Sequence, residues 1–97
     1  MQEEIFQSVY LALLEVPYGK VTTYGQLANV IGYPKNSRMV GKAMRYANLY
    51  GTYPCYKVLN SKGELLPGWK EQEMLLRQEG IEVHNRKVDL KKYLWPI

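Results

Sequence analysis

Cys55 carries the only thiol of this 97-residue chain, and a cysteine thiolate is an intrinsically strong nucleophile. A free thiol has a pKa of about 8.5, so only a few per cent is ionised at neutral pH without help from a neighbour. The next residue is Tyr56, and a phenol with a pKa of about 10 is a poor base at that pH. The only histidine, His84, lies far along the chain and is not expected to reach the cysteine.

A single cysteine also limits the other chemistry of the chain. It excludes an intrachain disulfide framework and a multi-cysteine zinc site, and no metal or organic cofactor is implied. No apolar run approaches the roughly 20 residues of a membrane span, and the N-terminus lacks a signal-peptide pattern. We therefore expect a cytoplasmic protein with no membrane partner.

The middle of the chain is basic and free of acidic residues. The net charge is +4, but residues 16–63 contain seven Lys and Arg and no Asp or Glu. The same stretch holds seven of the nine tyrosines. Basic and aromatic side chains together suit contact with phosphates, sugars and unstacked bases, which favours a nucleic-acid partner. A basic solvated surface, with tyrosines that only pack the core, would have the same composition.

Three short helices are expected in the first half of the chain. Apolar residues recur at helical spacing over 3–15, 24–31 and 38–46. Thr22 or Thr23 is placed to cap the second helix. Two short helices joined by a turn, with the second one basic, are typical of a helix-turn-helix.

Shorter elements are expected in the second half. A strand over 56–59, a turn over 60–63 and a returning segment over 64–66 would form a small wing. A helix is predicted over 71–78 and a short strand over 81–83, followed by a tail too apolar to be free. The expected fold is mainly α with a small β wing, a winged helix-turn-helix in a single domain that spans residues 1–97.

The stretch 16–59 resembles the DNA-binding and active-site domain of O6-alkylguanine-DNA alkyltransferases, and the resemblance covers most of residues 5–83. The matching segments are VPYGKVTTYG (16–25), PKNSRMVGKAMR (34–45), PCYKV (54–58) and QEG (78–80). The short chain and its YLWP tail (93–96) are more similar to the alkyltransferase-like proteins of that family.

The resemblance implies a protein that binds the DNA minor groove and rotates a damaged guanine out of the duplex. By position, Arg38 would fill the gap that the guanine leaves, and a planar, permanently charged guanidinium suits that role. Tyr24 would crowd the 3′ phosphate and help to rotate the nucleotide. Minor-groove binding reads little sequence, which suits a search for damage in any context. Further phosphate contacts are expected from Lys20, Lys35, Lys42 and Arg45.

The same resemblance implies a pocket for the flipped base. Its expected lining residues are Tyr24, Met44, Arg45, Cys55, Val58 and Trp69. The loop over 66–70 looks shorter than the loop of the enzymes, which predicts an open pocket that tolerates bulky O6 adducts.

The cysteine region departs from both branches of the family. In the active enzymes a histidine after the cysteine relays the thiol proton to a glutamate, whereas the alkyltransferase-like proteins usually replace the cysteine itself. Here Cys55 and Glu79 match the nucleophile and the acid, but Tyr56 and Lys57 stand where the enzymes have His and Arg. Either Cys55 is a small wall residue of a binding pocket, or local dipoles lower its pKa enough for slow transfer.

We favour the first interpretation. It predicts a protein that binds O6-alkylguanine in duplex DNA, flips the base with Arg38 and flags it for nucleotide excision repair without alkyl transfer. The expected partners are the damaged duplex and nucleotide excision repair proteins, and the expected state is a monomer. The alternative is a suicidal alkyltransferase that uses Cys55 and Glu79. A winged-helix regulator without lesion specificity is disfavoured, because it would not need Arg38 together with the Pro54-Cys55 segment.

Overall fold

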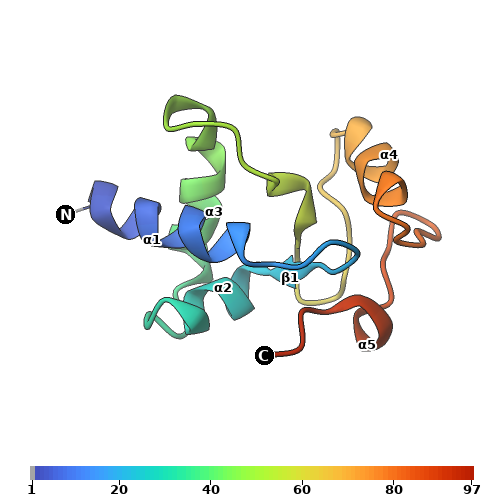
Figure 1. Cartoon of the computed structure of the whole chain (residues 1–97), viewed down its shortest axis with the longest axis horizontal. Coiled ribbons are helices and arrows are strands. Elements are labelled where there is room, and N and C mark those ends of the chain that lie inside the picture. Colours follow the sequence, from blue (N-terminus) through green and yellow to red (C-terminus); the bar gives the residue numbers. More distant parts are fainter. Residues whose placement is uncertain (1) are drawn as a thin grey trace.

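The structure, a computed structural model, describes residues 2–97 (Figure 1). Its elements are α1 (Gln2–Leu14), β1 (Thr22–Thr23), α2 (Tyr24–Val30), α3 (Ser37–Arg45), the 3-10 turns η1 (Ala47–Leu49) and η2 (Cys55–Lys57), β2 (Val58–Leu59), α4 (Glu71–Gln78) and α5 (Leu90–Tyr93). The predicted mainly helical fold with a small sheet is confirmed. No helix in the described part of the chain has the length and apolarity to cross a membrane.

Helices α1, α2 and α3 gather at the end of the molecule that holds the N-terminus (Figure 1). Their apolar stripes form a first hydrophobic cluster, with Val9 and Leu13 of α1, Leu27 of α2 and Val40 of α3 fully buried. The Tyr10 hydroxyl donates to the Ala43 carbonyl at 2.6 Å and so connects α1 to α3. This packing holds α3 with its other face turned to solvent.

The start of α2 follows from its threonines. Thr23, one of the two threonines predicted as the cap, is the N-cap. Its hydroxyl accepts from the Gln26 amide at 3.0 Å. The Thr22 hydroxyl instead donates to the Gln26 side chain at 2.6 Å. The cap satisfies one of the amides that a helix start leaves without a partner. It also places Tyr24 at the first position of α2.

The strand pairing differs from the expected hairpin. β2 pairs in parallel with β1, with Thr22 opposite Val58 and Thr23 opposite Leu59. Parallel strands need a long connection, and here the connection contains α2 and α3. Tyr56, expected at the start of a strand, lies in η2 instead.

The segment 64–66 does not return to pair along β2 because other groups occupy its backbone. Asn60 closes the turn by accepting from the amides of Lys62 and Glu64 at 3.0 and 2.9 Å. Glu64 forms an antiparallel bridge with Lys87, and the Leu65 amide donates to the Arg86 carbonyl at 3.0 Å. The Asn60 amide still donates to the Glu64 carbonyl at 3.5 Å, but beyond this turn the backbone of Leu65 bonds to the C-terminal part of the chain.

A second hydrophobic cluster lies in the C-terminal part, which has little regular structure. Its buried members are Val21, Leu59, Leu65, Leu76, Ile81, Val83, Val88 and Tyr93. Residues 81–83 form no strand, which corrects the sequence prediction. Gly63 lies in this region at a φ of 81°, and a side chain there would collide with the Val88 carbonyl.

The apolar tail packs against the domain, as predicted. The Trp95 amide donates to the Val21 carbonyl at 2.7 Å, and the Val21 amide donates to the Tyr93 carbonyl at 2.9 Å. Trp95 belongs to the first cluster and Tyr93 to the second. The tail therefore joins the two clusters.

Candidate functional site

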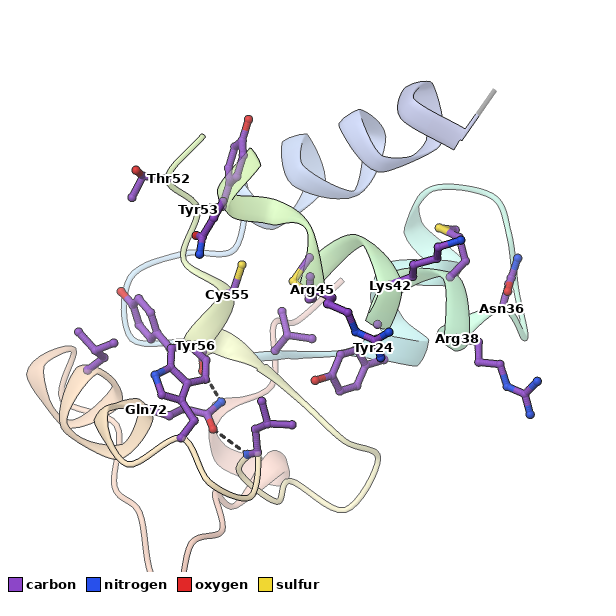
Figure 2. Close-up of a pocket in the computed structure, with 18 residues that line it drawn as sticks. Tyr24, Asn36, Arg38, Lys42, Arg45, Thr52, Tyr53, Cys55, Tyr56 and Gln72 are labelled. Atoms are coloured by element: carbon purple, nitrogen blue, oxygen red, sulfur yellow. Dashed lines mark hydrogen bonds between the residues drawn. The ribbon is translucent and has the colours of Figure 1, made fainter. Parts of the chain in front are cut away.

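A cavity of about 1160 Å³ lies between α3 and the C-terminal part of the chain (Figure 2). All six residues expected to line a pocket do so: Tyr24, Met44, Arg45, Cys55, Val58 and Trp69. They come from α2, α3, η2, β2 and the loop before α4. The fold thus brings together side chains that are separated by up to almost half of the sequence.

Several lining residues were not predicted. Among them are Asn48, Thr52 and Tyr53 after α3, Leu66 in the loop before α4, and Gln72 and Leu75 of α4. Thr52 and Tyr53 stand immediately before the Pro54-Cys55 segment, and that proximity was a usable signal. Gln72 had none, because a glutamine on a short polar helix usually faces solvent, whereas this one is 1% exposed.

The basic residues of α3 lie along the edge of this cavity. Arg38, Lys42 and Arg45 are three and four residues apart, which places them on one face of the helix. All three are exposed, line the cavity and make no ion pair within residues 2–97. In Figure 2 the Arg38 side chain extends away from the ribbon into open space. Its charge is thus available to an anionic partner.

The other two predicted DNA contacts lie elsewhere. Lys35 is exposed in the turn between α2 and α3, with a φ of 67°, and does not line the cavity. The Lys20 ammonium donates to the Lys92 carbonyl at 3.2 Å and is also outside the cavity lining. The structure therefore does not gather these two lysines with the basic residues of α3 around the cavity.

Tyr24 and Cys55 both remain protonated at neutral pH. Burial, followed by the nearby Cys55 group, raises the pKa of the half-buried Tyr24 phenol. Burial also raises the pKa of the Cys55 thiol, and a backbone hydrogen bond opposes that rise only in part. The backbone hydrogen bond thus lowers the thiol pKa by less than burial raises it.

Tyr56 is bound to the acid that was matched by position. Its hydroxyl donates to one carboxylate oxygen of Glu79, although 23 residues separate the two. Burial, followed by the hydrogen bond and charge of Glu79, raises the pKa of Tyr56 to about 12. A phenol in this state is a hydrogen-bond donor, so Tyr56 does not take up the proton of Cys55 at neutral pH.

Glu79 is the centre of a buried polar network. Its other carboxylate oxygen accepts from the Gly19 amide at 3.0 Å and pairs with the Lys57 ammonium at 3.0 Å. Lys57 also donates to the carbonyls of Val16 and Pro17 at 3.3 and 2.9 Å. Burial raises the pKa of the Glu79 carboxyl, but the hydrogen bonds from Tyr56, Gly19 and Lys57 together lower it below its ordinary value.

The remaining histidine takes no part in this site. The His84 amide donates to the Lys87 carbonyl at 2.9 Å, and the residue does not line the cavity. Among residues 2–97, no group of three or more His, Cys, Asp or Glu side chains is placed to hold a metal ion.

Comparisons with known proteins agree with this geometry. The family model described as 6-O-methylguanine DNA methyltransferase, DNA binding domain, matches residues 4–81. Alkyltransferase-like protein 1 of Schizosaccharomyces pombe is 35% identical over 96% of this chain and 95% of its own length. The DNA base-flipping protein of Vibrio parahaemolyticus is 34% identical over 96% of this chain and 97% of its own length.

Solved structures of a relative bound to DNA are similar over nearly their whole length. One of them is S. pombe Atl1 in complex with damaged DNA containing O6-carboxymethylguanine, with a TM-score of 0.89 and 33% identity. The match covers 98% of this chain and 97% of the other.

Proposed function

The chain belongs to the family of the 6-O-methylguanine DNA methyltransferase DNA-binding domain, and on that premise we propose that it recognises O6-alkylguanine in duplex DNA. In this proposal it flips the damaged base into the cavity and marks the site for repair without removing the alkyl group. The observation that carries the proposal is the basic face of α3 at the edge of a cavity large enough for a base.

The basic face supplies the contact with DNA. Lys42 and Arg45 bind phosphates near the cavity, and Lys20 and Lys35, which do not line the cavity, add further contacts. Such contacts release counterions, so the affinity falls steeply as the salt concentration rises. Tyr24, at the start of α2, crowds the phosphate beside the flipped nucleotide.

Arg38 enters the base stack in place of the flipped guanine. Its side chain is exposed and makes no ion pair within the described residues, so no internal interaction is lost when it inserts. Flipping costs a few kcal/mol and costs least for a base whose pairing is already weakened. Stacking and hydrogen bonding by the guanidinium offset that cost.

The cavity accepts the flipped base together with its adduct. Met44 and Val58 provide apolar walls, while Tyr24 and Trp69 provide aromatic surface. Pockets of roughly 300–1,000 Å³ hold drug-sized ligands, so a cavity of about 1160 Å³ leaves space for groups larger than methyl. We therefore propose a broad tolerance for O6 adducts.

The chemistry around the cysteine supports binding without transfer. The pKa of Cys55 is raised, and the hydroxyl of Tyr56 is already donated to Glu79. Tyr56 is thus not in place to take up the thiol proton at neutral pH. In this proposal the monomeric, cytoplasmic protein marks the lesion, and nucleotide excision repair proteins act on the marked site.

The retained thiol in the cavity wall favours one second candidate, a suicidal alkyltransferase. In that reaction the Cys55 sulfur bonds to the alkyl carbon, the bond from that carbon to guanine O6 breaks, and the guanine takes up a proton. The thiol proton must first leave, which the raised pKa makes slow.

The test combines binding with intact-protein mass spectrometry. Labelled duplexes that contain O6-methylguanine or guanine at one position are titrated with the protein at fixed salt, with Cys55→Ser as the control. We expect selective binding of the damaged duplex with no change in protein mass. A gain of one methyl group on the native chain alone would establish the alkyltransferase, and equal affinity for both duplexes would refute lesion recognition.

Arg38→Ala tests the flipping role, with Lys35→Ala as the matched control. We expect the arginine variant to lose affinity for the damaged duplex by about tenfold or more, because the gap in the stack stays empty. The control loses affinity for both duplexes to the same small extent. An Arg38→Ala variant with native lesion selectivity would show that another group fills the stack.

A further inference from the structure

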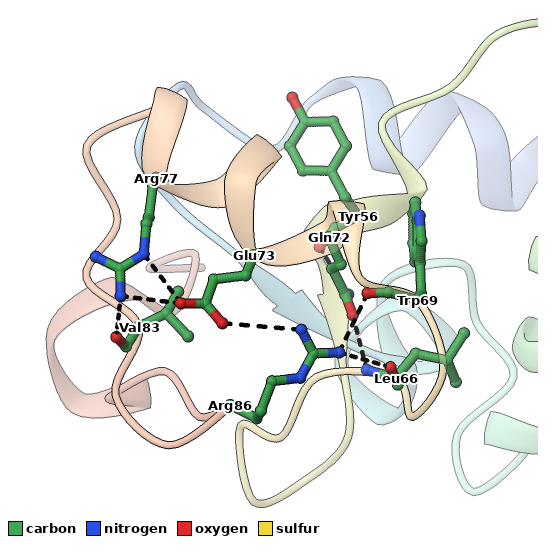
Figure 3. Close-up of polar contacts among 8 residues, drawn as sticks. All are labelled: Tyr56, Leu66, Trp69, Gln72, Glu73, Arg77, Val83 and Arg86. Carbon is green, nitrogen blue, oxygen red and sulfur yellow. Dashed lines mark hydrogen bonds and ion pairs between the residues drawn. The ribbon is translucent and has the colours of Figure 1, made fainter.

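Residues 66–70, here called the pocket loop, form one side of the cavity with few hydrogen bonds of their own. Leu66 and Trp69 from this loop line the cavity. Within the loop, the Trp69 amide donates to the Leu66 carbonyl at 3.3 Å. One backbone hydrogen bond, from the Gln72 amide to the Trp69 carbonyl at 3.3 Å, joins the loop to α4. The other hydrogen bonds that hold the loop come from side chains outside it (Figure 3).

Arg86 connects the pocket loop to the C-terminal part of the chain. One nitrogen of its guanidinium, Nη2, donates to the carbonyls of Leu66 and Trp69 at 2.9 and 3.1 Å. The other terminal nitrogen lies 3.8 Å from a carboxylate oxygen of Glu73. A single side chain thus binds both ends of the turn that presents Trp69 to the cavity. Arg86 lies beyond residues 4–81, the part that the family model matches.

Gln72 connects the same loop to η2. Its Oε1 accepts from the Leu66 amide at 2.7 Å, and its Nε2 donates to the Tyr56 carbonyl at 3.0 Å. Tyr56 follows Cys55 in η2, so the buried carboxamide spans from the loop to the cysteine segment. Both ends of the amide are satisfied, which sets its orientation.

We propose that Arg86 and Gln72 are positioning residues that order the pocket loop before DNA arrives, and that lesion selectivity depends on this order. The inference rests on the proposed function. A loop that is already in its binding conformation loses little conformational freedom when a base enters, so more of the contact energy remains as affinity. Undamaged DNA binds only through α3, so the order of the loop does not change its affinity.

Arg77 provides a matched control for Arg86. It donates to Glu73 through Nε and Nη2 at 3.1 and 3.0 Å, and to the Val83 carbonyl at 2.7 Å. It therefore shares the carboxylate partner and the charge of Arg86, but it has no hydrogen bond to the pocket loop. Arg77→Ala thus removes an arginine that contacts the same carboxylate, but it keeps the hydrogen bonds from Arg86 to the pocket loop.

The experiment compares the native chain with Arg86→Ala, Arg86→Lys and Arg77→Ala on duplexes with and without O6-methylguanine. We expect Arg86→Ala to reduce the ratio of damaged to undamaged affinity about tenfold, the size typical of a charge-assisted hydrogen bond. Arg86→Lys keeps the charge but not the planar fork, so it also lowers the ratio. Arg77→Ala keeps the native ratio.

Two results would overturn the inference. One is a native affinity ratio in Arg86→Ala. The other is an equal loss on both duplexes that Arg86→Lys restores, because that pattern would make Arg86 a phosphate contact.

Hydrogen exchange in the free protein separates this inference from the proposed function. We expect the Leu66 amide to exchange faster in Arg86→Ala than in Arg77→Ala, whatever DNA the protein prefers. Equal exchange in the two variants would show that Arg86 does not order the loop. A native protein without lesion preference, but with faster exchange in Arg86→Ala, would refute the proposed function and leave the ordering role of Arg86 intact.

Discussion

The α1–α3 region and the region from η2 to the C-terminus use their polar side chains in opposite ways. In the first, Arg38, Lys42 and Arg45 point to solvent, while apolar helix faces form the cluster beneath them. In the second, the buried Gln72 and the partly exposed Arg86 both bond to the backbone of Leu66, which is distant from Arg86 in the sequence.

In the α1–α3 region, the residues proposed to bind DNA are therefore different from those that stabilise the fold. In the region from η2 to the C-terminus, the same residues stabilise the fold and shape the cavity. A change on the exposed face of α3 removes charge but leaves the packing of the helix intact. A change in the second region removes hydrogen bonds that also shape the cavity. The following predictions test this contrast, from the largest expected effect to the smallest.

Glu79→Ala should have the largest effect on stability. The substitution leaves the Lys57 ammonium buried without its carboxylate partner, which costs about 3 kcal/mol of the free energy of unfolding. Glu82→Ala is the control, because Glu82 pairs with Lys92 at 2.9 Å in an exposed position. Urea unfolding should show a large loss for the first variant and a much smaller one for the second, whose carboxylate also accepts from the Tyr93 hydroxyl at 3.0 Å. Equal losses would mean that the Glu79 network is no more important than a surface pair.

Acid should weaken the same network. The folded-state pKa of Glu79 is lowered from 4.5, so its contribution to stability is complete above about pH 4.5 and is lost as the pH falls through the folded value. Glu79→Gln, which does not titrate there, is the reference. The difference in melting temperature between the native chain and this variant should shrink between pH 6 and pH 3. A difference that stays constant would contradict the lowered pKa.

Cys55 should react slowly in the folded protein. Burial raises the pKa of its thiol, so alkylation by iodoacetamide at pH 7.5 should be slower than for a free cysteine. The rate should increase as the pH rises toward 10. Unfolding the same protein in urea should restore the rate of a free thiol, and a fast reaction in the folded state would favour the alkyltransferase.

Lys42→Ala should have the smallest effect and should act on binding alone. Removing one phosphate contact should weaken both damaged and undamaged duplexes about threefold and reduce the slope of log affinity against log salt by about 1. The melting temperature should not change, because the side chain is exposed and unpaired within the described residues. Lys91→Ala, on the exposed face of α5, is the control and should bind as the native chain does. A lower melting temperature for Lys42→Ala would show that the exposed face of α3 also contributes to stability, which would contradict the contrast between the two regions.

The helices were predictable because their signals are local. The expected helices over 3–15, 24–31 and 71–78 agree with α1, α2 and α4 to within a residue at each end. Apolar periodicity and the Thr23 cap act between residues three or four apart, so the sequence alone contains that information. Most of the residues predicted to line the pocket lie in the segments that resemble the family. They could be predicted because the order of those segments along the chain is specific.

The wing and the neighbours of the cysteine were not predictable in this way. β2 pairs with β1, although two helices separate them in the sequence. The backbone of residues 64–66 forms its hydrogen bonds near Arg86. The backbone groups that accept these long-range hydrogen bonds are set by the tertiary packing of the whole chain. No residue spacing in the sequence indicates which groups they are.

The sequence by itself determined the helical register, the basic stretch and the replacement of the expected histidine by Tyr56. Only the tertiary structure decided that Tyr56 bonds to Glu79 and that Lys57 pairs with the same carboxylate. The physical reason is the range of the interactions. Helix formation depends on near neighbours in the chain, whereas burial and the hydrogen bonds of the cavity depend on segments that meet only in the folded protein.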